Sequence, residues 1–276
     1  MKLTSNAILT HRRYMLLAPE LTKNTYFKRT NVDSKRYGML LAGAQRLRGK
    51  AYFQMGALDA SQLTSDGRQI SEADDRSWHL LTLDERGQVV ACLRYLAHPV
   101  SVSFPELAIA RSALAKSEKW GHHVRQAVSG EIDRAKLCGY SYVEIGGWAI
   151  AEALRCTTEA LRMIVSAYAL AQLSGGALGI TTASLRSCSA SVLRRIGGRE
   201  LAVAGMRLPS FSDPQYKSTE VEILRFDSSN LNVRYRRWLE ESMGRLSEVP
   251  VIRRSSEERI CRRTEAWSAR LCSVTC

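Results

Sequence analysis

The apolar and polar positions between residues 140 and 198 follow a strand–helix–strand–helix pattern. Residues 142–145 form an extended run, and Gly146-Gly147 interrupts it before Trp148. Over residues 152–173 apolar side chains recur at the i, i+3, i+4 and i+7 spacing of one helix face. Residues 177–183 predict a short buried strand, and the helix after it ends at Gly197-Gly198. This unit predicts two parallel strands joined by a crossover helix.

The pattern on either side of this unit predicts an antiparallel hairpin and further helices. The hairpin pairs residues 77–83 with residues 89–96 around a turn that ends at Gly87. The other expected elements are a helix over 42–55, one or two helices over 104–137 broken near Gly121, strands over 200–206 and 219–226, and a helix over 232–246. Together they predict an α/β (α+β) fold with a mixed central sheet and helices on both faces.

The chain of 276 residues, 45% of them hydrophobic, suits one globular domain with appendages. We expect a basic N-terminal arm over residues 1–40, with at most one short element near residues 14–18. The folded domain then spans residues 41–248, and residues 249–276 form a basic C-terminal tail.

Positive charge is concentrated near the start of the chain. The formal net charge is +13, and the first 50 residues hold eleven Lys or Arg against only Glu20 and Asp33. Such a segment attracts an acidic partner, which could be nucleic acid, an anionic membrane surface, an acidic carrier protein or a phosphorylated ligand. It could equally be a solvated basic segment without a partner.

Cysteine and histidine positions argue against a metal or disulfide framework. The seven cysteines contain no CxxC pair, and the adjacent His122 and His123 diverge on a helix, so we expect no metal site. The N-terminus lacks a secretory apolar region, and no apolar run is long enough to cross a bilayer. We therefore expect a cytoplasmic protein, with peripheral membrane contact left open.

The order of the expected elements resembles the GNAT acyltransferase fold, with a bulged central sheet. The likeness is closest to acyl-homoserine lactone synthases and N-acyl amino acid synthases. The segments that carry it are Arg48 with Tyr52-Phe53, the acidic residues 72–75 before 77–81, residues 87–94 ending in Arg94, residues 143–150, and residues 189–198. The resemblance implies direct transfer of an acyl group from a thioester to an amine.

Two departures from the family pattern bear on the substrates. Homoserine lactone synthases usually place a Ser-Arg pair directly after the strand glutamate, where this chain has Gly146-Gly147, and this disfavours S-adenosylmethionine. The turn before the long helix, residues 155–160, lacks the glycines that wrap a pyrophosphate in acetyl-CoA-dependent relatives. The backbone N–H groups near Arg155, Thr157 and Thr158 can still hold a phosphate. We expect no bound cofactor. We expect the co-substrate to be an acyl-phosphopantetheine thioester, carried either by CoA or by acyl carrier protein. We favour acyl carrier protein, because such proteins are acidic and the N-terminal arm is basic.

Amide formation from a thioester needs a proton acceptor and donors for the developing oxyanion. We assign the first role to Glu144. Gly146 and Gly147 allow the strand to bulge and to turn backbone N–H groups towards the carbonyl. The residues expected to hold the acceptor are Arg48, Glu72, Asp74, Asp75, His79, Arg94 and Trp148.

Several of these residues have simpler interpretations. The glycine pair is also typical of a plain bulge, and residues 72–75 are typical of a solvated loop. His79 is typical of a histidine packed in the core, although it could also serve as the general base in place of Glu144. Trp148, Tyr52 and Phe53 could line an acyl pocket or belong to the core. Residues 187–189 (Ser-Cys-Ser) lack an arguable His–Asp pair and make a weak nucleophile.

The sequence thus predicts an N-acyltransferase that moves a fatty acyl group to an amino acid or a related small amine. One alternative is an acetyl-CoA-dependent N-acetyltransferase of a small amine or protein. A second is a basic regulatory protein that binds nucleic acid without catalysis, but no helix-turn-helix or aromatic-basic stripe supports it, so we expect no specific nucleic-acid partner.

Overall fold

A mixed ten-stranded sheet runs through the whole computed structural model, which describes residues 13–19 and 27–255. The strand order is β10-β11-β6-β5-β4-β3-β1-β12-β2, with β7 paired to β11 beside this path. The strands are β1 Arg13–Leu17, β2 Thr30–Val32, β3 Trp78–Leu83, β4 Val89–Ala97, β5 Ser141–Ile150, β6 Ala177–Ser184, β7 Arg199–Glu200, β10 Phe211–Asp213, β11 Thr219–Asp227 and β12 Val251–Arg253. A separate small hairpin joins β8 Ala202–Val203 to β9 Met206–Arg207.

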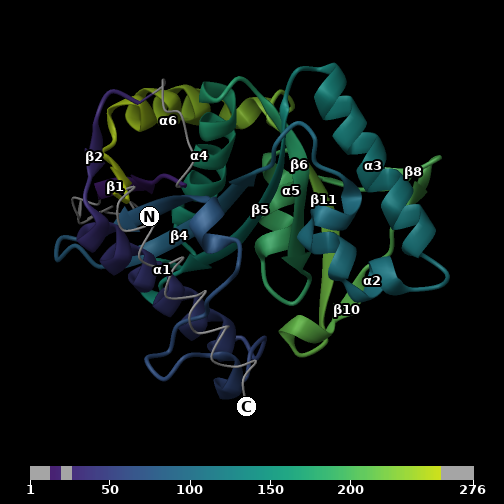
Figure 1. The fold of residues 1–276 in the computed structure, drawn as a ribbon, viewed down its shortest axis with the longest axis horizontal. Helices are drawn as coiled ribbons and strands as arrows, with labels where there is room; N and C mark the ends of the chain where they lie inside the picture. The colour runs from purple at the N-terminus through teal and green to yellow at the C-terminus, as the bar shows by residue number, and fades with distance from the viewer. Residues whose placement is uncertain (1–12, 20–26, 256–276) are drawn as a thin grey trace, which may run out of the picture.

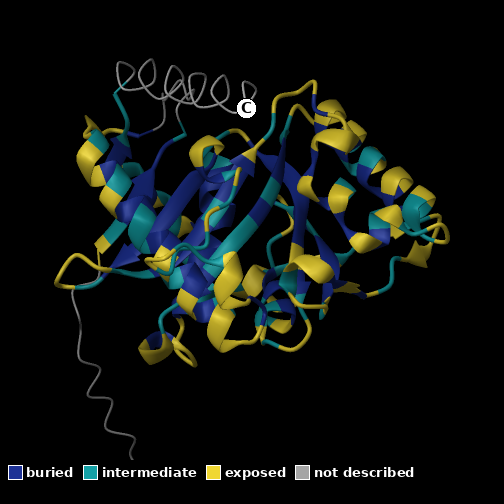
Figure 2. Ribbon diagram, turned by 60° about the horizontal axis from the view of Figure 1, so that its bottom comes forward, coloured by how far each residue is buried: buried dark blue, intermediate teal, exposed yellow. Residues whose placement is uncertain are grey.

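Helices cover both faces of the sheet, as the sequence predicts. They are α1 Ser34–Gln54, α2 Ala113–Lys116, α3 Gly121–Leu137, α4 Glu159–Leu173, α5 Ser189–Ile196 and α6 Arg236–Glu248. Helices α4, α5 and α6 bury their apolar sides in one core, and α1 and α3 bury theirs in two cores on the opposite face. Figure 1 shows α4 and α6 above the left half of the sheet and α1 below it. Buried residues follow the strands, while exposed residues lie on the outer sides of the helices (Figure 2).

Strands β5 and β6 diverge in the middle of the sheet. They pair in parallel from Ser141↔Ala177 to Ile145↔Thr181, which confirms the predicted parallel pair. Beyond these positions no pairing joins them among the described residues, although β5 continues to Ile150 and β6 to Ser184. A gap between two strands therefore opens at Gly146.

The predicted bulge lies at the point of divergence. On β4, Cys92 pairs with Ala149 and Arg94 pairs with Gly146, so two steps along β4 match three along β5. Gly147 takes a φ of +59°, a conformation that L residues rarely adopt. The glycine pair thus permits the extra residue that kinks β5 away from β6.

Three expected boundaries differ in the structure. Helix α1 starts at Ser34, because Asp33 caps it by accepting a hydrogen bond from the Arg36 N–H at 2.9 Å. The long crossover helix α4 starts only at Glu159, because the preceding residues form a short 3₁₀ turn and Cys156 has a φ of +63°. The single strand expected over 200–206 is three short ones, interrupted by a turn at residues 204–205 with positive φ.

The flanking segments also supply strands to the sheet. The short element expected near residues 14–18 is β1, which pairs with β3 on one side and β12 on the other. Strand β12 in turn pairs in parallel with β2. Both the predicted arm and the predicted tail therefore contribute to the same sheet as the domain between them, while their outer parts, residues 1–12, 20–26 and 256–276, lie outside the described residues.

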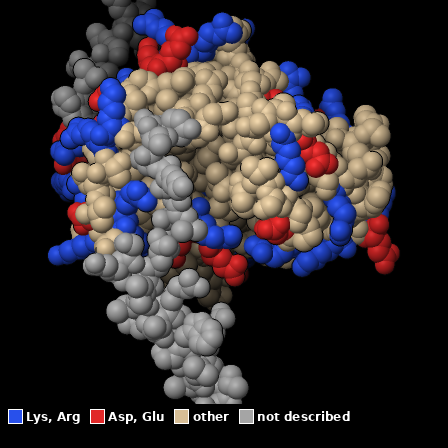
Figure 3. All heavy atoms as spheres, turned by 45° about the horizontal axis from the view of Figure 1, so that its top comes forward, with Lys and Arg blue, Asp and Glu red and all other residues tan. Residues whose placement is uncertain are grey.

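Surface charge is spread beyond the N-terminal part of the chain. On the face drawn in Figure 3, Lys and Arg side chains lie around much of the rim, with Asp and Glu between them. Within the described ranges, no helix has both the length and the apolar character needed to cross a membrane.

Candidate active site

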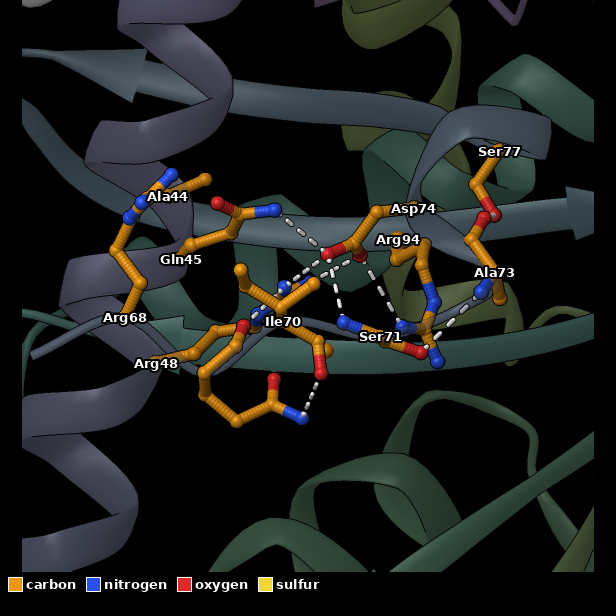
Figure 4. Close-up of polar contacts among 12 residues, drawn as sticks. Ala44, Gln45, Arg48, Arg68, Ile70, Ser71, Ala73, Asp74, Ser77 and Arg94 are labelled. Atoms are coloured by element: carbon orange, nitrogen blue, oxygen red, sulfur yellow. Dashed lines mark hydrogen bonds and ion pairs between the residues drawn. The ribbon is translucent and has the colours of Figure 1, made fainter. Parts of the chain in front are cut away.

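A buried carboxylate, Asp74, organises the face of the sheet beneath α1. It is 2% exposed, and the Arg48 guanidinium binds it with two hydrogen bonds, from Nη1 to Oδ1 at 2.8 Å and from Nη2 to Oδ2 at 2.6 Å. Arg94 of β4 adds a contact from Nη1 to Oδ1 at 3.3 Å, and the Gln45 amide donates to Oδ2 at 3.0 Å. Figure 4 shows these side chains and Ser71 grouped around the carboxylate. One aspartate therefore fixes two arginines in place.

The spacing of α1 brings these partners to one side of the helix. Gln45, Arg48 and Tyr52 follow one another at helical intervals of three and four residues, so all three face the sheet. Arg48 is 1% exposed and also donates from Nη2 to the Gln69 carbonyl at 2.8 Å. A cation this deeply buried requires the carboxylate beside it.

These contacts determine the protonation states of Asp74 and His79. Burial alone disfavours the charged form of Asp74, but the hydrogen bonds and charge of Arg48 outweigh it and hold the pKa of Asp74 well below its usual range. Burial lowers the pKa of His79 to about 4, so this imidazole is neutral near neutral pH and its Nε2–H donates to the Asp74 carbonyl at 2.8 Å. The cluster of Arg48, Asp74 and Arg94 carries one net positive charge.

The bulge lies directly against the two arginines. A Cβ built on Gly147 would lie 3.0 Å from Arg48 Nη1 and 3.2 Å from Arg94 Cβ, whereas one on Gly146 would meet Arg94 Nη2 at an ordinary 3.5 Å. A side chain at Gly147 would therefore require the arginines to shift by a few tenths of an ångström. The glycine pair and the arginine cluster form one site.

Side chains from α1 and β4 also hold the backbone of the bulge. The Tyr52 hydroxyl donates to the Trp148 carbonyl at 3.3 Å, and the Cys92 thiol contacts the Gly147 carbonyl at 3.5 Å. Burial raises the pKa of Cys92 to about 11, which keeps it a neutral thiol. Tyr216, from the loop between β10 and β11, meets the Tyr52 ring edge-on with the ring centres 6.1 Å apart.

Glu144 lies two residues before the bulge, on the sheet face that also carries Gly146. Its Oε1 accepts a hydrogen bond from the Ala108 backbone N–H at 2.9 Å, and its Oε2 lies 2.9 Å from His98 Nε2. The Glu144 side chain is 14% exposed and that of His98 is 5% exposed. The carboxylate is thus fixed at the edge of the site with part of its surface open.

Other residues predicted for the site lie apart from this cluster. Glu72 is exposed, and Asp75 is 60% exposed and pairs with Arg254 at 2.8 Å, so neither shares the buried position of Asp74. Trp148 packs into the core on the opposite face of the sheet, beside α4. Phe53 is exposed at 51%, near the C-terminal end of α1.

The turn before α4 contains the three residues predicted to hold a phosphate. Arg155 is exposed and donates from Nη2 to the Gln54 side chain at 3.1 Å, which links this turn to the end of α1. The hydroxyl of Thr157 donates to the Leu154 carbonyl at 2.7 Å, and that of Thr158 accepts from Arg162 at 3.3 Å. In the Ser-Cys-Ser segment, the Ser187 and Ser189 hydroxyls bond each other at 2.8 Å. Among the described residues no group of His, Cys, Asp and Glu has a geometry suited to a metal ion.

The sequence alone does not identify His98, Gln45 or Tyr216 as members of the site. His98 follows an apolar strand and reaches Glu144 only through the pairing of β4 with β5. Gln45 precedes Arg48 by one helical turn, and this spacing was the available signal for it.

Comparisons with known proteins place the fold. No family model matches the chain, and no curated protein matches it in sequence. Among solved structures, the CoA-dependent acyl-homoserine lactone synthase BjaI, in a complex with SAM and isopentyl-CoA, superposes with a TM-score of 0.50 at 13% identity, covering 88% of this chain and 93% of that one. The chain shares its overall fold with that synthase. The predicted GNAT-like architecture, with its central bulged sheet, is thereby confirmed.

Two other solved structures align with this chain with lower TM-scores. FeeM, an N-acyl amino acid synthase from uncultured soil microbes, aligns with a TM-score of 0.41 at 10% identity over 67% of this chain and 83% of its own. A putative N-acetyltransferase from Lactobacillus plantarum aligns with a TM-score of 0.42 at 12% identity over 78% and 97%. The fold assignment rests on the likeness to BjaI alone.

Proposed function

We propose that this protein is an N-acyltransferase that moves an acyl group from a phosphopantetheine thioester to the amine of an amino acid or a related small molecule. The observation that carries the proposal is the bulge at Gly146-Gly147, which opens the sheet beside a cationic cluster and a fixed carboxylate.

The acceptor is an amine that also bears a carboxylate. Asp74 neutralises one of the two arginines, so the remaining positive charge of the cluster is available to an anion. Arg94 is the more accessible partner, with 19% of its side chain exposed against 1% for Arg48. An amino acid would place its carboxylate against the Arg94 guanidinium, which suits planar anions.

In the transfer step the neutral amine nitrogen attacks the thioester carbonyl carbon. The carbon–sulfur bond breaks and the sulfur leaves as a thiolate, while the proton lost by the amine passes to the Glu144 carboxylate. Transfer of that proton on to the thiolate gives the free thiol and regenerates the carboxylate. Backbone N–H groups of the bulge would stabilise the negative charge that develops on the carbonyl oxygen. The products are the N-acyl amine and the free phosphopantetheine thiol.

We expect the acyl donor to carry negative charge, because the structure has a groove in which basic residues predominate. The groove, of about 840 Å³, runs between α1 and the β3–β4 turn. Basic residues outnumber acidic ones in its lining, which includes Arg36, Arg46, Lys50, Arg86 and Arg155 along with Asp84, Glu85 and Glu152. The lining also contains Gln54, which Arg155 contacts, and Ile150 at the C-terminal end of β5. Both an acidic carrier protein and the phosphates of CoA fit this charge, and we favour the carrier protein with a fatty acyl chain.

The test is an acyl-transfer assay with the purified protein. Acyl carrier protein loaded with a medium or long acyl chain, and the matching acyl-CoA, are each incubated with a mixture of amino acids, and N-acyl products are identified by mass spectrometry. We expect product with at least one amino acid, and Glu144→Gln should lower the turnover rate by about 10²–10⁴-fold. No product from either donor would refute the transferase, and full activity of Glu144→Gln would refute the base assignment.

A further inference from the structure

Two hydrogen-bond donors from the loop after β4 hold the Glu144 carboxylate. His98 follows directly after β4, and its own backbone N–H donates to the Tyr142 carbonyl of β5 at 2.9 Å. Its Nε2 lies 2.9 Å from Glu144 Oε2, while the Ala108 N–H lies 2.9 Å from Oε1 and 3.2 Å from Oε2. The loop therefore reaches across from β4 to fix a side chain on the neighbouring strand.

These donors fix the position of Glu144. Its two carboxylate oxygens are held from two different points of the loop, so the side chain cannot turn without breaking one of the contacts. The other ionisable groups near the pair include Glu106 on the same loop, Glu131 of α3, which pairs with Arg225 at 3.1 Å, and the buried phenol of Tyr142.

We infer that His98 is a positioning residue for the proposed transfer, which holds the Glu144 carboxylate in place on the sheet face that carries Gly146. This inference rests on the proposed function, because it assigns His98 a role only through Glu144. A general base must lie within hydrogen-bond distance of the proton that it takes, and the contact from His98 Nε2 serves this requirement by fixing the carboxylate.

Three variants test this role in the acyl-transfer assay with whichever carrier or CoA thioester is turned over by the wild type. His98→Ala removes one donor, His98→Gln replaces it with an amide N–H, and Ala108→Pro removes the other. Ala108 begins a 3₁₀ helix after Leu107, whose φ of −82° and ψ of 150° suit a residue before proline, so this change removes the N–H at small structural cost. His122→Ala on α3 is the control histidine, and melting curves verify folding for every variant.

His98→Ala should lower kcat roughly tenfold and change the KM for the donor little. The loss in kcat is smaller than the about 10²–10⁴-fold that a general base contributes, because Glu144 itself remains. Ala108→Pro should lower kcat in the same way. His98→Gln should restore most of kcat. Unchanged kcat in His98→Ala would overturn the inference, as would His98→Gln being no better than His98→Ala. An inactive wild type would instead refute the proposed function.

Discussion

Replacing Asp74 by asparagine is the sharpest test of the buried cluster. The Asp74→Asn change would keep the shape of the side chain but remove the charge that Arg48 and Arg94 share. The Arg48 guanidinium, 1% exposed, would then remain buried without a counter-charge.

The expected loss follows from the burial of this pair. Removing one partner of a buried ion pair typically costs about 3–5 kcal/mol, because the other charge stays desolvated. Such a loss is a large part of the about 5–15 kcal/mol that stabilises a typical domain. At about 2–4 °C per kcal/mol for a domain of this size, the melting midpoint should fall by roughly 6–20 °C.

Thermal and urea unfolding, followed by circular dichroism near neutral pH, measure this change. Asp75→Asn is the matched control, because Asp75 is 60% exposed and its pairing with Arg254 is worth about 0–1 kcal/mol at most. The low pKa of Asp74 means that its contribution is complete above the ordinary aspartate pKa of about 4 and is lost as the pH falls below it. Equal midpoints for the Asp74→Asn and Asp75→Asn variants would refute the reasoning.

Two further changes probe the same site. Gly147→Ala should destabilise the protein by about 1–3 kcal/mol, since it forces a side chain into a positive-φ conformation 3.0 Å from Arg48, whereas Gly146→Ala meets an ordinary contact and should change stability little. Urea unfolding of both variants compares them, and a larger loss for Gly146→Ala would mean that the strained position is misassigned. The pKa of His79 is lowered to about 4 in the folded protein, whereas it is about 6.5 in the unfolded chain, so the unfolded state binds the proton first as the pH falls. The free energy of unfolding of the wild type should therefore decline by about 3 kcal/mol between about pH 6.5 and pH 4. His79→Gln keeps a donor for the Asp74 carbonyl and should flatten that part of the urea-midpoint profile, and an unchanged slope would contradict a neutral buried imidazole.

Local patterns were sufficient to predict most of the fold. The hairpin of β3 and β4, the parallel strands β5 and β6, and the bulge in β5 follow from alternation and from glycine positions, which act within a few residues. The strand β12 was not predicted, because its three residues form part of a sheet only when β1 and β2 flank them. Such an assignment depends on partners more than two hundred residues away.

The candidate site was predicted less completely, because burial separates residues that look alike in the sequence. Glu72, Asp74 and Asp75 form one acidic run, yet only Asp74 is buried against Arg48. His98 and Glu144 are 46 positions apart and meet through strand register. The assignment of Glu144 as the base stays a prediction until the transfer assay is made.

The place of β12 between β1 and β2 has a consequence for how the protein is made. Strands near the beginning of the chain have a gap between them that only residues 251–253 fill. During synthesis on the ribosome, this edge of the sheet must therefore wait until residues 251–253 have been translated and released from the exit tunnel. The central hairpin and the β5–β6 unit can form earlier, while this edge closes only when β12 inserts between β1 and β2.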